Sequence, residues 1–192
     1  MPDGTRLRAA LQRPGGGSSD FDLNPDIILP PGRTLRPAAV LVAVWGDRLV
    51  LTKRSSHLKH HPGQIAFPGG KLDPSDASLE AAALRESREE IGLPEASVDL
   101  WARLPAHETV TGFTMTPILG RITTAFTPTP EAGEVDEVFT VPLSHVLTPA
   151  NYVIERRLWR GTWRRYYAVP YGPCYIWGAT ARILRGLADR VQ

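Results

Sequence analysis

Three glutamates lie close together in the stretch Arg85–Leu93, which reads RESREEIGL. Glu86 precedes Glu90 by four residues and Glu89 by three, so on a helix all three would project from one side. Like charges at these spacings repel each other, and a divalent cation would remove the repulsion. Clustered carboxylates suit Mg²⁺ or Mn²⁺, and Mg²⁺ commonly shares its coordination shell with substrate phosphates. The stretch therefore predicts a metal site for phosphate chemistry, with Glu86, Glu89 and Glu90 as ligands.

The same stretch has a plainer interpretation, because alternating charges also mark helix faces that are exposed to water. In that interpretation Arg85 forms a salt bridge with Glu89 and no metal is involved. The sequence upstream favours the metal site. Phe67–Lys71 reads FPGGK, and glycines, which lack a Cβ, let the backbone approach a metal or a phosphate closely. We expect Arg85 to orient Glu89 or another carboxylate rather than to contact a substrate.

The helix that carries the glutamates is predicted from Ser78 to Ile91, with Asp76 or Ser78 as its N-cap. Gly92 and the proline two residues later end it. Helical spacing predicts an inward face made of Ala81, Leu84, Ser87 or Arg88, and Ile91.

Around this helix the hydrophobic pattern predicts a mixed sheet. Pro37–Trp45 is a continuous apolar run typical of a buried strand, and a Gly-Asp turn pairs it with Arg48–Lys53 as a hairpin. Further elements are predicted as strands at Gln64–Phe67, Val98–Leu104, Thr116–Ile122 and Glu137–Pro142, a helical turn at Leu143–Leu147, a hairpin within Leu158–Val169 around Gly161, and a last helix at Tyr175–Ala188. The expected class is α/β, or α+β with a mixed sheet, with helices flanking the sheet.

Length and composition narrow the function further. A chain of 192 residues suits one domain with a sizeable core, and its net charge of only +2 predicts neither a nucleic-acid partner nor a membrane partner. No apolar run approaches the roughly 18 residues of a membrane span, and the N-terminus lacks the apolar core of a secretory signal. The single cysteine, Cys174, cannot form an internal disulfide and is interpreted as a packing residue. We expect a cytoplasmic protein.

The segment Gly70–Leu93 resembles the signature of the Nudix hydrolases, in which a glycine and an acidic residue precede REUXEEXGU, with U hydrophobic. Two positions depart from it: Asp76 takes the place of the first glutamate, one residue too far from Arg85, and Ser87 takes a hydrophobic position. The resemblance implies an α/β/α sandwich and a hydrolase of nucleoside diphosphates that are linked to another group. It also implies a Mg²⁺ or Mn²⁺ ion held by Glu86, Glu89, Glu90 and the Gly69 carbonyl.

A second and narrower resemblance is to the coenzyme A pyrophosphatase subfamily. The segments 51–55 (LTKRS) and 67–70 (FPGG), with Gly63 between them, are similar to its additional signature, although Lys59 stands where that signature has arginine. Similar segments follow at Thr109–Phe113, Thr116–Pro117, Gly133–Leu143 and Ile176–Thr180. The resemblance implies a small-molecule substrate, coenzyme A or its acyl forms, cut to 3′,5′-ADP and 4′-phosphopantetheine. The departures at Lys59 and Ser87 keep open a general nucleotide or NADH-type pyrophosphatase.

The resemblance also implies residues that bind the substrate. Arg54, Lys59 and His61 belong to a cationic group just before the glycines, and with Gly70 they are expected to hold the 3′-phosphate or the pyrophosphate. For a single loop histidine, the alternative is simple exposure to solvent. Phe113 and Trp177 are candidates for stacking on adenine, and core packing is the alternative for Trp177.

A general base is required as well. Relatives often recruit a late carboxylate, and Glu134 is favoured over Glu137 because it begins a Glu-Val pair like that of the subfamily. Glu86 or Glu89 is an alternative base, and a solvated acidic loop is the alternative for Glu134 itself.

The resemblance covers about residues 36–188, which predicts a Nudix domain over 36–192 and a partly flexible extension over 1–35. Within the extension, a short helix is expected over Thr5–Gln12 and a break over 13–19, where the sequence reads RPGGGSS. A Nudix-like binding module without catalysis is a further alternative, although such proteins typically lose the motif glutamates that this chain keeps. A homodimer is compatible with the sequence.

Overall fold

The computed structural model describes residues 2–11, 15–29, 31–159 and 161–192. The helices are α1 (Pro2–Ala10), α2 (Leu79–Ile91), α3 (Leu143–Val146) and α4 (Ala179–Val191), with 3₁₀ turns at Glu95–Ser97 and Pro149–Asn151. The strands are β1 (Ser18–Ser19), β2 (Arg36–Trp45), β3 (Arg48–Arg54), β4 (Ile65–Ala66), β5 (Gly69–Lys71), β6 (Val98–Arg103), β7 (His107–Glu108), β8 (Phe113–Ile122), β9 (Val135–Pro142), β10 (Val153–Trp159) and β11 (Thr162–Ala168).

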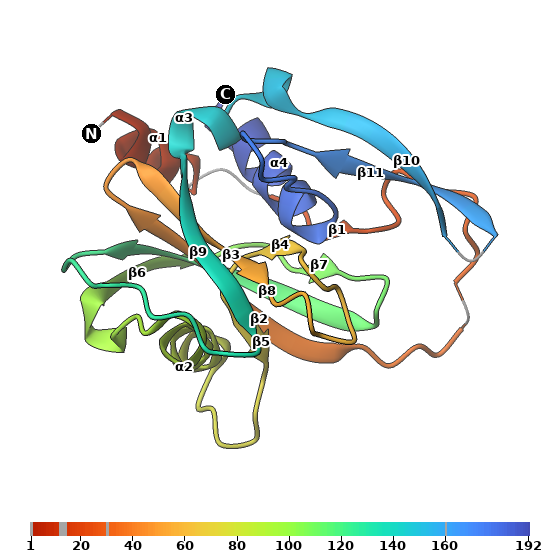
Figure 1. Ribbon diagram of the computed structural model, residues 1–192. Coiled ribbons are helices and arrows are strands. Elements are labelled where there is room, and N and C mark those ends of the chain that lie inside the picture. Colours follow the sequence, from red (N-terminus) through yellow and green to blue (C-terminus); the bar gives the residue numbers. More distant parts are fainter. Residues whose placement is uncertain (1, 12–14, 30, 160) are drawn as a thin grey trace.

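A mixed sheet forms the centre of the molecule, in the order β1-β7-β8-β2-β3-β4. Strand β2 runs parallel to β8 and antiparallel to β3 and β5, while β9 pairs with β3 and β6 with β8. Figure 1 shows α2 on one face of this sheet, and α4 with the separate hairpin β10–β11 on the other. The predicted fold class, a mixed sheet between helices, is confirmed.

The alternation of side chains along β2 explains the two layers. Successive residues of a strand point to opposite faces. Val40, Val42 and Val44 belong to the apolar cluster that includes α4, whereas Ala39, Leu41 and Ala43 belong to the cluster that includes α2. Buried on both faces, β2 can therefore be apolar throughout, as the sequence pattern indicated. The small alanines on the second face let α2 approach the sheet.

Helix α2 begins where the sequence predicted, but its buried face is rotated. The Ser78 side chain accepts the Ala81 N–H at 3.1 Å, and Gly92 ends the helix in a left-handed conformation with φ of 70°. The predicted inward face is correct for Ser87 and Ile91, which are buried, and for Leu84, which is half-buried and packs against the core under α2; it is wrong for Ala81 and Arg88, which are half-buried and exposed. Three other residues of the helix are buried as well: the alanines Ala82 and Ala83, and the glutamate Glu90. A helix selected only for packing would not bury a carboxylate.

The segment before the sheet is attached to the main fold. Leu7 of α1 is fully buried in the cluster around α4, and β1 pairs with β7. His107 of β7 is also fully buried, where its ring nitrogens contact Ser18 Oγ at 2.9 Å and Asp20 Oδ1 at 3.1 Å. The predicted break over 13–19 lies partly outside the described residues, as does the predicted helix end at position 12. The division into an extension and a domain at residue 36 stays a prediction.

Other elements also differ from the sequence prediction: β8, β9 and β10 begin at Phe113, Val135 and Val153, earlier than the predicted Thr116, Glu137 and Leu158. Strand β5 was not predicted, because its glycines have no side-chain pattern. Helix α4 begins at Ala179 rather than Tyr175, because Gly178 has φ of 67° and ψ of −139°, which a helix cannot contain. The hairpin around Gly161 is confirmed, with Arg160 outside the described residues.

Candidate active site

The site is built on two adjacent glycines that bring β5 against α2. Gly69 has φ of 149°, and a Cβ on it would collide with the Ala39 carbonyl oxygen and the Val40 side chain. A Cβ on Gly70 would lie 2.5 Å from the carboxylate carbon of Glu86. The first glycine is therefore required by the backbone and by β2, and the second by the glutamate beside it.

Glu90 is the buried acid of the site. Its side chain is on the inner face of α2, the residue is only 6% exposed, and Oε2 accepts the Gly69 N–H at 3.0 Å. Burial raises the pKa of this carboxyl to about 7, against the lowering effect of that hydrogen bond, and the charges of Glu86 and Glu134 raise it further. The charge of Arg54 lowers the pKa of Glu90, but not enough to offset burial.

Glu86 lies one helical turn before Glu90 and is half-buried. Burial raises its pKa, the nearby Arg85 guanidinium lowers it, and the charges of Glu89 and Glu134 raise it. The two acids Glu86 and Glu90 thus approach the two glycines side by side, as the spacing predicted.

Arg85 holds the outer acids of the helix. Its guanidinium donates to both carboxylate oxygens of Asp76, at 2.8 and 2.9 Å, and to Glu89 at 2.9 Å, and it lies 3.1 Å from Glu86. Glu89 is accordingly turned towards Arg85, with a side chain 51% exposed. Among the described residues, no three acidic, histidine or cysteine side chains are gathered into a ready metal cage. The expectation that Arg85 orients carboxylates matches this arrangement, and Glu89 stands apart from the other two glutamates.

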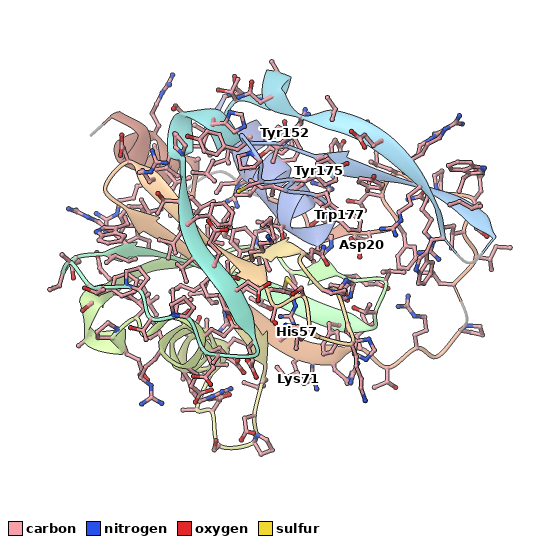
Figure 2. All side chains as sticks on the ribbon, in the orientation of Figure 1. Asp20, His57, Lys71, Tyr152, Tyr175 and Trp177 are labelled. Carbon is pink, nitrogen blue, oxygen red and sulfur yellow. The ribbon has the colours of Figure 1, made fainter. Side chains whose placement is uncertain are left out.

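The cationic residues lie on a loop that leaves β3 at a bulge. Arg54 donates its N–H to the Gln64 carbonyl at 3.0 Å and accepts the Gly63 N–H at 3.1 Å, which closes the loop between them. Arg54 is half-buried, and its charge lowers the pKa of Glu90, so it lies near the acids. Lys59 and His61 are exposed on the loop, as is the neighbouring His60. In Figure 2 the labelled His57 of this loop and Lys71 of β5 lie towards the α2 side of the sheet.

Glu134 immediately precedes β9 and is tied to the same loop. Its carbonyl accepts the Ser55 N–H at 2.8 Å, and the charge of its exposed side chain acts on both Glu86 and Glu90. The charge of the other candidate base, Glu137, instead affects Cys174. Burial is the main cause of the raised pKa of this thiol, and Glu137 raises it further. The structure therefore brings Glu134 close to the acids of α2.

The donor set fits a divalent cation. Carboxylate oxygens of Glu86 and Glu90 are hard ligands, burial raises the pKa of both acids, and Gly69 offers backbone beside them. Mg²⁺ usually takes only one or two protein carboxylates and keeps waters, so a preformed cage is not needed.

Sequence reasoning missed some of the residues that position this site. Asp76 departs from the motif, yet it is the strongest partner of Arg85, a role that its place in the turn before the helix did not reveal. Ser87 is buried at the hydrophobic position and satisfies its hydroxyl by donating to the Ala83 carbonyl at 2.7 Å. Asp136 accepts the Ser56 N–H at 3.0 Å and so fixes the cationic loop.

The two aromatic candidates lie in other parts of the fold. Phe113 begins β8 under the Arg36 guanidinium, and Trp177 contacts Tyr166 and Tyr175 beside the hairpin. Figure 2 shows Tyr175 and Trp177 on the α4 side of the sheet. Trp177 is only half-buried and belongs to neither main core cluster.

Comparison with known proteins agrees with this geometry. A family model of the NUDIX domain matches residues 34–159, and the chain belongs to the Nudix family. It is 43% identical over 162 residues to a protein of Enterobacter sp. (strain 638), covering 81% of this chain and 83% of that one. A Citrobacter koseri protein is 44% identical over 165 residues, covering 83% and 86%. Both relatives are described as uncharacterized Nudix hydrolase NudL.

Solved structures share the fold at low sequence identity. The NUDIX domain of Shewanella oneidensis NrtR, complexed with ADP ribose, superposes with a TM-score of 0.52 at 15% identity, covering 85% of this chain and 94% of that one. An ADP-ribose pyrophosphatase of Streptococcus suis superposes with a TM-score of 0.50 at 18% identity, covering 81% of this chain and 91% of that one. The sandwich fold expected for a Nudix hydrolase is thus confirmed. Among the described residues, no helix is long and apolar enough to cross a bilayer.

The Gly70→Ala variant tests the close approach of β5 and α2. The new Cβ would displace the Glu86 carboxylate, while the backbone, which is not left-handed here, would tolerate alanine. We expect Mn²⁺ affinity, measured by titration calorimetry, to fall at least about 10-fold. This is the usual loss of affinity when a group that positions a metal ligand is changed. Gly16→Ala, with no atom near its Cβ, is the control. Unchanged affinity in Gly70→Ala would contradict the arrangement.

A second prediction concerns pH in metal-free protein. Because the folded-state pKa of Glu90 is about 7, above its ordinary 4.5, the folded chain binds the proton more tightly than the unfolded chain between these values. Stability in EDTA should fall as pH rises through this window, by at most about 3 kcal/mol. Glu90→Gln should remove most of this fall in the free energy of unfolding. The measurement is urea unfolding of both proteins at pH values on either side of the window. The exposed Glu131→Gln is the control, and an identical pH dependence in Glu90→Gln would refute the assignment.

Proposed function

We propose that this Nudix-family chain cleaves the pyrophosphate of coenzyme A or its acyl forms, releasing 3′,5′-ADP and 4′-phosphopantetheine. Members of the family act on pyrophosphate bonds in small molecules and generally require a divalent ion such as Mg²⁺ or Mn²⁺. The observation that carries the proposal is the convergence of Glu86 and Glu90 on Gly69 and Gly70. Both acids keep raised pKa values despite Arg85 beside Glu86 and the charge of Arg54 near Glu90, and a divalent cation would supply the further positive charge.

In this proposal the chain's residues divide the work of binding and orientation. Glu86 and Glu90 hold the metal, with the Gly69 carbonyl beside them and Glu89 available once it leaves Arg85. The ion, when bound, neutralises phosphate charge and orients the group that is cleaved. Gly70, without a Cβ, lets the Glu86 carboxylate lie against the backbone of β5, and the Gly70 backbone is proposed to contact the substrate.

Glu134 is the proposed general base. Its carboxylate lies near both α2 acids, and its backbone is fixed by Ser55 at the root of the cationic loop. It is exposed, so it can reach a water molecule and pass the proton to solvent. Glu86 is the alternative base, but its burial and its place beside Gly70 favour metal binding.

The positive charges of the cationic loop are the reason for proposing coenzyme A as the substrate. Arg54 lies nearest the acids and is proposed to contact the pyrophosphate, while Lys59 and His61 are exposed farther along the loop and are proposed to meet the 3′-phosphate. A lysine forms no bidentate pair with a phosphate, so binding through Lys59 is less directional than through arginine. An NADH-type pyrophosphatase is the second candidate, since that substrate lacks the 3′-phosphate and would not need the loop.

The experiment is product analysis with Mg²⁺ or Mn²⁺ on coenzyme A, 3′-dephospho-coenzyme A and NADH. We expect 3′,5′-ADP from coenzyme A and a kcat/KM at least about 10-fold higher than for the dephospho form, the value of one charge-assisted contact. Lys59→Ala should remove this preference, and Lys71→Ala is the matched control. Glu86→Gln should lower kcat by about 100-fold or more with every substrate.

Each outcome addresses a separate part of the proposal. Rapid turnover of NADH without turnover of coenzyme A would refute the substrate and leave the pyrophosphate chemistry intact. Unchanged turnover by Glu86→Gln would refute the metal site itself. A chain that turns over no pyrophosphate with any metal would be a binding module.

A further inference from the structure

The hairpin β10–β11 carries two pairs of arginines in directly opposed positions. Arg156 lies opposite Arg165 across the strand pair, and Arg157 lies opposite Arg164. Like charges in directly opposed positions destabilise a strand pair. None of the four has a carboxylate within ion-pair distance in the described part of the chain. Arg157 lies over the Trp177 ring and Arg164 over the rings of Phe21 and Trp159, which offsets part of this cost, so the exposed pair Arg156 and Arg165 is the one that packing explains least.

These arginines make the distribution of charge along the chain uneven. Residues 153–168 contain five arginines and one glutamate, a net charge of +4, so the other residues together carry −2 against a total of +2. The small total charge therefore hides a strongly positive segment. The sequence-based expectation of no attraction to anionic surfaces treated the charge as uniform, and the hairpin shows that it is not.

Large apolar side chains share one face of the hairpin with two of these arginines. Ile154, Leu158 and Trp163 are 54, 55 and 58% exposed. Residues two apart on a strand, and residues opposite each other on an antiparallel pair, lie on the same face. By the strand register, Arg156 and Arg165 lie between the isoleucine on one side and the leucine with the tryptophan on the other. The Arg156 guanidinium also covers the Trp163 ring at 5.0 Å. We call these five residues the hairpin face.

The hairpin is attached firmly at one edge. The Asn24 side chain accepts the Arg165 N–H at 2.8 Å and donates to the Arg165 carbonyl at 2.9 Å. These two hydrogen bonds use the backbone groups on the outer edge of β11. Towards its base, Tyr167 packs against the core that includes α4. Figure 1 shows the far end of the hairpin extending away from the central sheet. On this side of the hairpin, Tyr167 opposite Ile154 packs on the core, whereas the five residues of the hairpin face are exposed to solvent.

We propose that the hairpin face docks on an anionic lipid bilayer. Guanidinium groups attract anionic headgroups, at about 1 kcal/mol for each residue near the surface. Tryptophan favours the headgroup level, and exposed leucine and isoleucine enter the boundary below it. Single-stranded nucleic acid is the other polyanion to consider, but Ile154 and Leu158 offer no ring for a base to stack on. Aliphatic side chains on both sides of the arginines therefore favour lipid.

The test is cosedimentation with vesicles of phosphatidylcholine containing about 30% phosphatidylglycerol, compared with phosphatidylcholine alone. The wild-type chain should bind the anionic vesicles, and salt should weaken that binding. The double variant Arg156→Gln/Arg165→Gln should bind about 30-fold more weakly, which corresponds to two such contacts. The exposed pair Arg6→Gln/Arg121→Gln removes the same charge elsewhere and should bind like wild type. Leu158→Ser should weaken binding without changing its preference for anionic lipid.

Folding of the variants is checked by thermal unfolding, where loss of an opposed arginine pair should not lower the midpoint. Equal binding to neutral and anionic vesicles, or equal weakening by both double variants, would overturn the proposal. So would an absence of vesicle binding by the wild-type chain. Tighter binding to single-stranded polythymidine than to anionic vesicles would assign the hairpin face to nucleic acid instead.

Discussion

The close approach of β5 to α2 is the constraint on which the site depends. Gly69 lets β5 lie close to β2, Gly70 leaves the space that the Glu86 carboxylate occupies, and Glu90 accepts the Gly69 N–H. Burying an acid costs free energy unless a cation or hydrogen bonds compensate it. One backbone N–H meets Glu90 here, and its pKa remains raised. The site is therefore a place where the fold accepts lower stability in its metal-free form.

The rest of the molecule can be understood as support for that contact. Small residues on one face of β2 and on α2 set the distance between helix and sheet. Arg85 gathers the acids that are not at the contact, Asp76 among them, and thereby limits repulsion along the helix. The bulge at Arg54 brings a positive charge and the cationic loop to the same end of the sheet. The proposed binding groups and metal ligands thus come from several separate elements of the fold.

Much of this was predictable from local patterns, and the remainder depended on tertiary contacts. The apolar run of β2, the capped helix α2 and the spacing of its glutamates are local signals, and they predicted the sheet, the helix and the pair Glu86 and Glu90. The spacing of Arg85 and Glu89 also predicted their salt bridge, whereas no local signal showed that Arg85 would bind Asp76 as well. Strand β5 and the attachment of α1 were likewise hidden, since one has no side-chain pattern and the other rests on the burial of Leu7 against a distant helix.

The central claim is that the two acids beside the glycines form a divalent-metal site. The most direct measurement is an anomalous difference map from a crystal of the full chain soaked in Mn²⁺. The account predicts a peak within coordination distance, about 2.0–2.3 Å, of carboxylate oxygens from both Glu86 and Glu90, with the Gly69 backbone next to it. A strong peak elsewhere, with these two side chains still bound only to protein groups, would contradict it.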